Sequence, residues 1–173
     1  MTTMRTLIAS ALIAVILSPV ARAQPTPKPG PEHDIFKKQV GTWETTMKMG
    51  TVEEKGTATY KMDLGGLWLV STFESNFGGS PFSGRGFDSY DAGKKKYVSV
   101  WMDSMSTAPI VMEGTYDTAK KTLTMVGDAP GPDGKAVKHK AVSEMPDDDT
   151  INFSMYMGDA KQPTFTILYK RKK

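Results

Sequence analysis

Short alternating segments separated by compact turns fill the chain from residue 41 to its end and constrain its fold more than any other feature. Turn-forming residues recur about every 8 to 12 positions, a spacing typical of β-sandwiches and barrels. Turns this short leave no room for crossover helices, so neighbouring strands must pair antiparallel. The pattern predicts strands at residues 42–49, 55–63, 67–76, 81–90, 96–104, 109–117, 121–127, 136–145, 150–157 and 164–171.

The motif Gly41-Thr42-Trp43 stands at the start of this series. A sheet of about ten strands with one apolar face closes on itself or splits into two packed sheets, and a single up-and-down barrel is the simpler solution. Gly-x-Trp at the start of an antiparallel run is typical of lipocalin-like barrels, where glycine permits the bend and the indole plugs one end. In such barrels a basic side chain of the last strand covers the tryptophan, and Lys170 or Arg171 stands at that place here.

The N-terminal residues 1–23 have the organisation of a signal peptide. Arg5 supplies the charged region, Leu7 to Leu17 the apolar region, and Ala21-Arg22-Ala23 the small-residue cleavage site. The apolar run falls short of the about 20 residues that span a bilayer, so we expect export without a stable membrane anchor. The expected location is the periplasm or the extracellular medium.

The rest of the chain is expected to be a proline-rich spacer, residues 24–31, followed by one barrel domain, residues 32–173. A short helix beginning near Pro31 should cap one end of the barrel, with His33 exposed on it. The sequence contains no cysteine, so no disulfide can form and the domain depends on burial for its stability. Without Arg5 and Arg22, 20 of the 22 basic residues remain against 19 acidic ones, which indicates no nucleic-acid partner.

His139 is the first candidate for a functional side chain. Lys138 and Lys140 must face solvent, so strict alternation turns Val137, His139 and Ala141 inward. An inward imidazole is able to ligate haem iron, as in haem-binding barrels of the nitrobindin kind, or to bind another metal or orient a polar ligand. The simpler interpretation is a hydrogen-bonded interior histidine.

Methionine is abundant, with ten residues left after Met1 and Met4 are removed with the signal peptide. Met47-x-Met49 and Met155-x-Met157 each place two thioethers on one face of a strand. Such sulfur ligands suit Cu(I), but methionine more often fills cores and lines apolar cavities. We expect packing or cavity lining here.

Polar and aromatic residues concentrate between positions 84 and 113. If the hairpin turns near Ser106, one face carries Ser99, Trp101, Asp103, Val111 and Glu113, and the other carries Val98, Val100, Met102, Ile110 and Met112. We expect the aliphatic face inside. The opposite register would bury Asp103 and Glu113 as an acid/base pair.

No nucleophile elbow, phosphate loop, zinc spacing or cysteine nucleophile occurs in the sequence. Asp147-Asp148-Asp149 has the donors for calcium, although an acidic turn between two strands is the commoner interpretation.

Several motifs together resemble the bacterial family catalogued as domain of unknown function 1579, over roughly residues 31–171. The resemblance implies a single lipocalin-like barrel, often exported, and carries over no established activity. Its recurring Trp-x-Asp-Ser stretch corresponds to Trp101, Asp103 and Ser104. The motifs are Pro31-Glu32-His33, Gly41-Thr42-Trp43-Glu44, Leu64-Gly65-Gly66, residues 81–86, residues 97–106 and Glu113-Gly114-Thr115-Tyr116-Asp117.

The sequence thus predicts an all-β, lipocalin-like barrel that binds a small, mainly apolar or amphipathic molecule, as a monomer or homodimer. The alternatives are a haem- or metal-binding barrel using His139, an envelope interaction protein, and a hydrolase-like enzyme using Asp103 and Glu113. We expect no enzymatic activity, no dedicated metal site and no cofactor other than haem. The expected ligand-binding residues are His139, Trp101, Asp103, Ser104, Met102 and Met112, and the expected closure residues are Gly41, Trp43 and Arg171.

Overall fold

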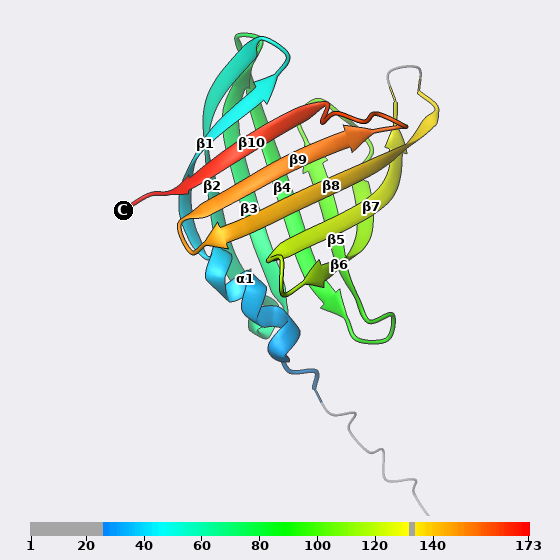
Figure 1. The fold of residues 1–173 in the computed structure, drawn as a ribbon. Helices are drawn as coiled ribbons and strands as arrows, with labels where there is room; N and C mark the ends of the chain where they lie inside the picture. Colours follow the sequence, from blue (N-terminus) through cyan, green and yellow to red (C-terminus); the bar gives the residue numbers. More distant parts are fainter. Residues whose placement is uncertain (1–25, 132–133) are drawn as a thin grey trace, which may run out of the picture.

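Ten antiparallel strands close into a barrel in the computed structural model, which describes residues 26–131 and 134–173 (Figure 1). Each strand pairs with its neighbours in sequence, and the first strand pairs with the last. The predicted fold class is therefore confirmed, while the predicted signal peptide lies outside the described residues. The strands are β1 (Gly41–Met49), β2 (Val52–Asp63), β3 (Trp68–Phe77), β4 (Ser80–Asp91), β5 (Lys96–Asp103), β6 (Ile110–Asp117), β7 (Thr122–Pro130), β8 (Ala136–Asp147), β9 (Thr150–Met157) and β10 (Phe165–Arg171).

Aspartate and glycine residues shape the turns of the barrel. At one end, the side chains of Asp91, Asp117 and Asp147 each accept a backbone N–H two or three residues later, at 2.9 to 3.0 Å. At the other end, Gly50, Gly78, Gly79 and Gly158 adopt positive φ, which glycine tolerates without strain. These local preferences explain why turn residues in the sequence locate the strands so well.

A short helical segment covers the end that carries the aspartate turns, hereafter the capped end (Figure 1). It consists of a 3-10 turn (Pro31–His33) followed by α1 (Asp34–Gln39). Phe36 is buried and its ring meets the edge of Tyr97 at a centroid distance of 5.6 Å. The helix therefore seals the barrel with apolar side chains, as expected.

His33 is buried, with only 5% of its surface exposed, so the expectation of an exposed His33 is wrong. Residues three apart on a helical turn share a face, which puts His33 beside Phe36 against the barrel. Its Nδ1 accepts a hydrogen bond from the backbone N–H of Gly30 at 3.2 Å. The imidazole thus anchors the segment that leads into the barrel.

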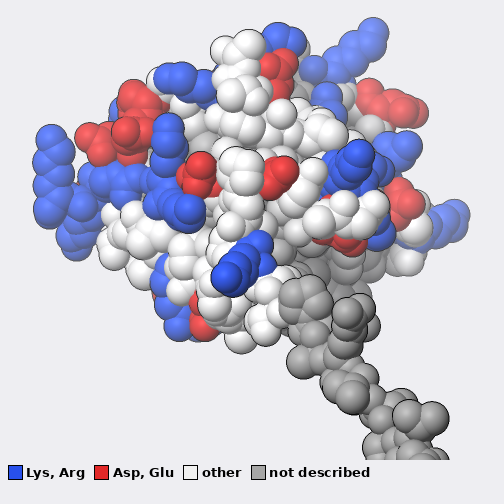
Figure 2. Space-filling view, turned by 90° about the horizontal axis from the view of Figure 1, so that it is seen from below, with Lys and Arg blue, Asp and Glu red and all other residues white. Residues whose placement is uncertain are grey.

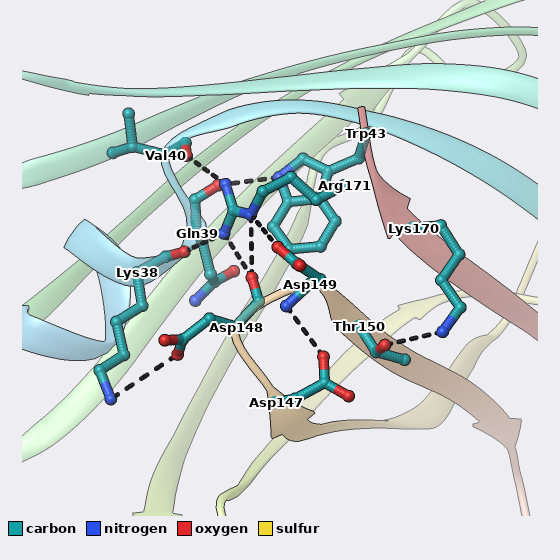
Figure 3. A network of polar contacts seen from close by, with 10 residues as sticks. All are labelled: Lys38, Gln39, Val40, Trp43, Asp147, Asp148, Asp149, Thr150, Lys170 and Arg171. Atoms are coloured by element: carbon teal, nitrogen blue, oxygen red, sulfur yellow. Dashed lines mark hydrogen bonds and ion pairs between the residues drawn. The ribbon is translucent and has the colours of Figure 1, made fainter. Parts of the chain in front are cut away.

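Arg171 covers Trp43 at the capped end (Figure 3), which confirms the predicted closure. The guanidinium carbon lies 4.2 Å from the centroid of the indole, and the indole N–H donates to the carbonyl of Gln39 at 2.9 Å. Gly41 has a φ of 134°, and a Cβ at that position would lie 2.8 Å from Nη1 of Arg171. Glycine is therefore required both for the backbone bend and for the close approach of the arginine.

The acidic turn Asp147-Asp148-Asp149 also belongs to this closure (Figure 3). Arg171 forms an ion pair with Asp149 at 3.1 Å and donates to the carbonyl of Asp148. This pairing supports the interpretation of the acidic stretch as a turn between strands.

The outer surface mixes both signs of charge. Figure 2, which views the molecule from below the orientation of Figure 1, shows Lys and Arg interspersed with Asp and Glu on that face. No helix in the described part of the chain is long and apolar enough to cross a membrane.

Candidate functional site

The barrel encloses a cavity of about 480 Å³. All ten strands contribute to its wall, because alternate side chains of each strand point inward. Residues Phe36 and Gln39 of α1 contribute to the wall at the capped end. The larger apolar side chains that the strands contribute to the wall include Met47, Met49, Phe73, Phe77, Phe82, Trp101, Ile110, Met112, Leu123, Met125, Phe153, Met155, Met157, Phe165 and Ile167.

Methionines make up much of this wall. The pairs Met47-x-Met49 and Met155-x-Met157 all line the cavity, which agrees with the expectation of packing or cavity lining. Thioether side chains are flexible and polarisable, so such a wall adapts its shape to different apolar ligands. Among the described residues, no group of three or more His, Asp or Glu side chains is arranged to hold a metal ion.

Strand β5 presents Ser99, Trp101 and Asp103 to the cavity, so the expectation of an aliphatic inner face on this strand is wrong. Met102, expected to contact ligand, is 42% exposed on the outside of the barrel. On β6, Ile110 and Met112 face inward. Trp101 pairs with Ile110 and Ser99 with Met112, so the register differs by one residue from that assumed in the sequence.

The alternative of a buried acid/base pair formed by Asp103 and Glu113 is also wrong. Glu113 lies on the outer surface, where it forms ion pairs with Lys94 and with Lys96. Asp103 faces the cavity. The two carboxylates are therefore on opposite faces of the barrel wall.

Two glycines of β4 explain the orientation of β5. Gly86 pairs with Trp101 and Gly84 with Asp103. A Cβ at Gly84 would lie 2.2 Å from the Trp101 ring, and one at Gly86 would lie 2.3 Å from Oγ of Ser71. The indole thus lies flat over the bare backbone of β4, which only glycine permits. Gly84-x-Gly86 is the sequence signal that could have identified this face.

The Trp-x-Asp-Ser stretch forms a local hydrogen-bonded unit. The indole N–H of Trp101 donates to Asp103 at 2.9 Å, and the other carboxylate oxygen of Asp103 accepts from the backbone N–H of Met105 at 2.9 Å. Ser104 is exposed and its hydroxyl accepts from the backbone N–H of Ser83 at 3.1 Å. Ser104 therefore joins the end of β5 to β4 and does not line the cavity.

His139 points into the barrel, as predicted, and is only 2% exposed. Its Nδ1 lies 2.8 Å from the carbonyl oxygen of Val137. A carbonyl can only accept, so Nδ1 carries the proton in this hydrogen bond and Nε2 is left with a lone pair in the neutral ring. The structure thus agrees with a hydrogen-bonded interior histidine whose second nitrogen remains available.

Asp88 is a cavity residue to which the sequence interpretation assigned no role. It lies on the inner face of β4 and pairs with Ser99, whose hydroxyl donates to its carboxylate. Burial raises the pKa of Asp88 to about 6, and the Ser99 hydrogen bond offsets part of this increase. Gly84, Gly86 and Asp88 lie two residues apart along β4 and therefore share its inner face. The Gly84-x-Gly86 pattern could thus have predicted that Asp88 faces the cavity.

Two tyrosines belong to the same polar region. The hydroxyl of Tyr60 hydrogen-bonds to that of Tyr169, and the ring centroids are 6.3 Å apart. Burial raises the pKa of Tyr60, and burial raises the pKa of Tyr169 to about 12. Asp88 adds to both increases through its negative charge. Both phenols are therefore neutral hydrogen-bonding groups at physiological pH.

Comparison with solved structures finds proteins of similar shape. The crystal structure of Rv2717c from M. tuberculosis is similar with a TM-score of 0.60 and 16% sequence identity, covering 83% of this chain and 99% of that one. A de novo designed fluorescence-activating β-barrel has a TM-score of 0.48 and 13% identity, covering 80% of this chain and 98% of that one. No curated protein matches the sequence. The family described as protein of unknown function (DUF1579) matches residues 28–171, and the chain therefore belongs to that family.

Proposed function

We propose that the protein binds a small, mainly apolar molecule inside its barrel. The observation that carries this proposal is the cavity of about 480 Å³ walled by methionine and aromatic side chains. Ligand pockets for small molecules fall in the range of about 300 to 1,000 Å³ and combine apolar walls with a few polar groups. Asp88, Ser99 and His139 are the polar groups that would orient the ligand.

Displacement of the neutral fluorophore Nile red, together with native mass spectrometry of protein purified from its host, tests this proposal. Ser143→Leu adds an apolar side chain to the wall and is expected to weaken Nile red binding about fivefold or more, because it occupies cavity volume. Glu144→Leu changes the adjacent exposed position and serves as the matched control. Absence of any displaceable fluorophore would overturn the proposal.

Haem binding at His139 is a second candidate, favoured by one observation. The hydrogen bond from Nδ1 to Val137 resembles the outer contact that orients metal-ligating histidines and leaves Nε2 free. His139 would hold the iron, and the methionine and aromatic wall would surround the macrocycle. Because no Lys or Arg is among the described wall residues, the haem carboxylates would have to reach solvent.

A visible absorption spectrum after haem addition tests this candidate. Axial ligation predicts a spectrum that differs from free haem in the native protein and reverts in His139→Ala. Two spectra that both match free haem would exclude it.

We also propose export to the periplasm or the medium. The charged, apolar and small-residue regions of residues 1–23 support it. Cell fractionation with mass determination of the mature chain tests it, and the expected N-terminus is Gln24.

A further inference from the structure

Asp88 is a carboxylate inside the barrel that has no cationic partner. None of the ion pairs found in the described part of the chain involves it, and its hydrogen-bond partner is the neutral hydroxyl of Ser99. A buried charge without a partner is unfavourable, because it loses its hydration and no ion pair compensates for that loss. Such a group is a candidate for interaction with a ligand.

Asp88 lies towards the capped end of the cavity. Along β4, the inward residue after Asp88 is Tyr90, whose ring meets His33 at the capped end. Ser99 on the neighbouring strand β5 faces the carboxylate, and Tyr60 on β2 and Tyr169 on β10 are close enough for its charge to raise their pKa values. Towards the opposite end the wall carries the apolar side chains of Met47, Met49, Phe73, Phe77, Phe82, Met157 and Phe165, together with the polar side chains of Ser75, Asn76, Asp103, His139 and Thr164.

The charges of the wall favour a cationic ligand over an anionic one. Asp88 and Asp103 are its carboxylates, His139 is its single imidazole, and no described wall residue is Lys or Arg. A ligand carboxylate would meet two like charges, whereas an ammonium group would find its counter-ion in Asp88. Asp103 is already engaged by the Trp101 indole, so Asp88 is the open partner.

We propose that the cavity binds an amphiphilic amine, with its ammonium group against Asp88 and Ser99 and its apolar part along the methionine and phenylalanine wall. This inference rests on the proposed binding function and specifies the ligand class for the same cavity. Tyr60 and Tyr169 offer neutral oxygens to the remaining N–H groups of the ammonium. The ionised form of Asp88, which predominates above its pKa of about 6, is the form that pairs with the amine.

Competition of three decyl compounds against Nile red tests the ligand class. Decylamine, decan-1-ol and decanoic acid share one tail and differ only in the head group. At about pH 7.5 we expect decylamine to compete at least about tenfold more strongly than either of the others, because it alone supplies a cation to Asp88. Equal competition by the amine and the alcohol, or stronger competition by the acid, would overturn the inference.

Substitutions test whether the preference for decylamine depends on Asp88 and Ser99. Asp88→Asn is nearly isosteric and should reduce decylamine affinity about tenfold or more while leaving decan-1-ol affinity within about twofold. Ser99→Ala, which removes the hydroxyl that hydrogen-bonds to Asp88, should weaken decylamine binding in the same direction. Glu113→Gln removes a carboxylate from the outer surface of β6 and should change neither affinity.

The outcomes distinguish this inference from the proposed function. If Nile red binds and is displaced, but head group and Asp88→Asn make no difference, the cavity binds apolar ligands and the amine assignment is wrong. If Nile red binds but none of the three decyl compounds displaces it, the amine assignment fails, and if Nile red does not bind, both proposals fail. Retained Nile red binding by Asp88→Asn shows that this variant is folded.

Discussion

Arg171 connects three segments that are far apart in the sequence. Its guanidinium donates to the backbone carbonyls of Lys38 and Val40 at the end of the helix and to that of Asp148 in the β8–β9 turn. It also covers the Trp43 ring. Arginine suits this place because its planar fork of N–H donors and its flat face serve different partners at once.

Removal of this side chain should destabilise the whole barrel. We expect Arg171→Ala to lower the free energy of unfolding by about 1 to 3 kcal/mol, because three backbone carbonyls lose their donor and the indole is uncovered. Arg171→Lys should recover only a small part of the loss, since an ammonium group has no fork. Urea denaturation measures both, and Lys170→Ala, at the exposed neighbouring position, is the control. A loss no larger than that of the control would contradict the assigned role.

Thr45 carries a buried hydroxyl without a hydrogen-bond partner among the described residues. Thr45→Val replaces this hydroxyl with a methyl group of similar size, so we expect the free energy of unfolding to rise by about 1 kcal/mol. Thr46→Val on the outer face is the matched control, because Thr46 accepts a hydrogen bond from Lys55 at 2.8 Å. Thermal denaturation should show a higher melting temperature for Thr45→Val only. No increase would indicate that the hydroxyl is satisfied in solution.

At the scale of the strand, β4 and β5 behave as one unit. The bare backbone at Gly84 and Gly86 provides the surface on which Trp101 lies. This packing decides that Ser99 and Asp103 also face the cavity, since strand side chains alternate. The glycines therefore determine the chemistry of the cavity although they contribute no functional group.

Gly84→Ala tests this coupling. The added Cβ would overlap the Trp101 ring, so we expect a loss of about 1 to 3 kcal/mol in the free energy of unfolding, with a change in tryptophan fluorescence. The double variant Gly84→Ala/Trp101→Phe should show less than the sum of the two single effects, because the smaller ring relieves the overlap. Additive effects would mean that the two residues do not interact.

The sequence allowed the strands and the barrel closure to be predicted, but not all of the cavity. Turn residues such as Asp117 and the charged neighbours of His139 fix local geometry, so the strand positions and the inward histidine followed from them. The face of β5 did not follow from hydrophobicity, because its inner residues are Ser99, Trp101 and Asp103 and its outer ones are aliphatic. Polarity is reversed there because a cavity wall, unlike a packed core, accepts polar groups.

At the scale of the whole molecule, Asp88 makes stability depend on pH. Its pKa is about 6 in the folded protein and near the usual value of about 3.9 in the unfolded chain, so the folded state retains the proton longer. The stabilising contribution of protonated Asp88 to the free energy of unfolding is therefore fully present below about pH 4 and is lost as the pH rises through about 6. Tyr60 and Tyr169 also face Asp88, but they stay neutral over this range.

Asp88→Asn should accordingly be more stable than the native protein at about pH 7.5, by an amount on the order of 3 kcal/mol, and equally stable near pH 4. Urea denaturation at several pH values measures the difference. Asp117→Asn is a control in which the stability difference should have the opposite sign at about pH 7.5. A backbone hydrogen bond from Lys120 lowers the pKa of Asp117, so the ionised side chain stabilises the folded protein. A difference between Asp88→Asn and the native protein that does not vary with pH would contradict the assigned burial effect.

The pairing of β1 with β10 has a consequence for how the chain acquires its structure. Trp43 lies opposite Arg171, so the contacts that complete the ring join residues almost as distant in sequence as this domain allows. Contacts of such long sequence separation form late and slow the folding of β-proteins. A growing chain therefore has two unpaired sheet edges until its final strand is available. The ring forms only after β10 has been synthesised.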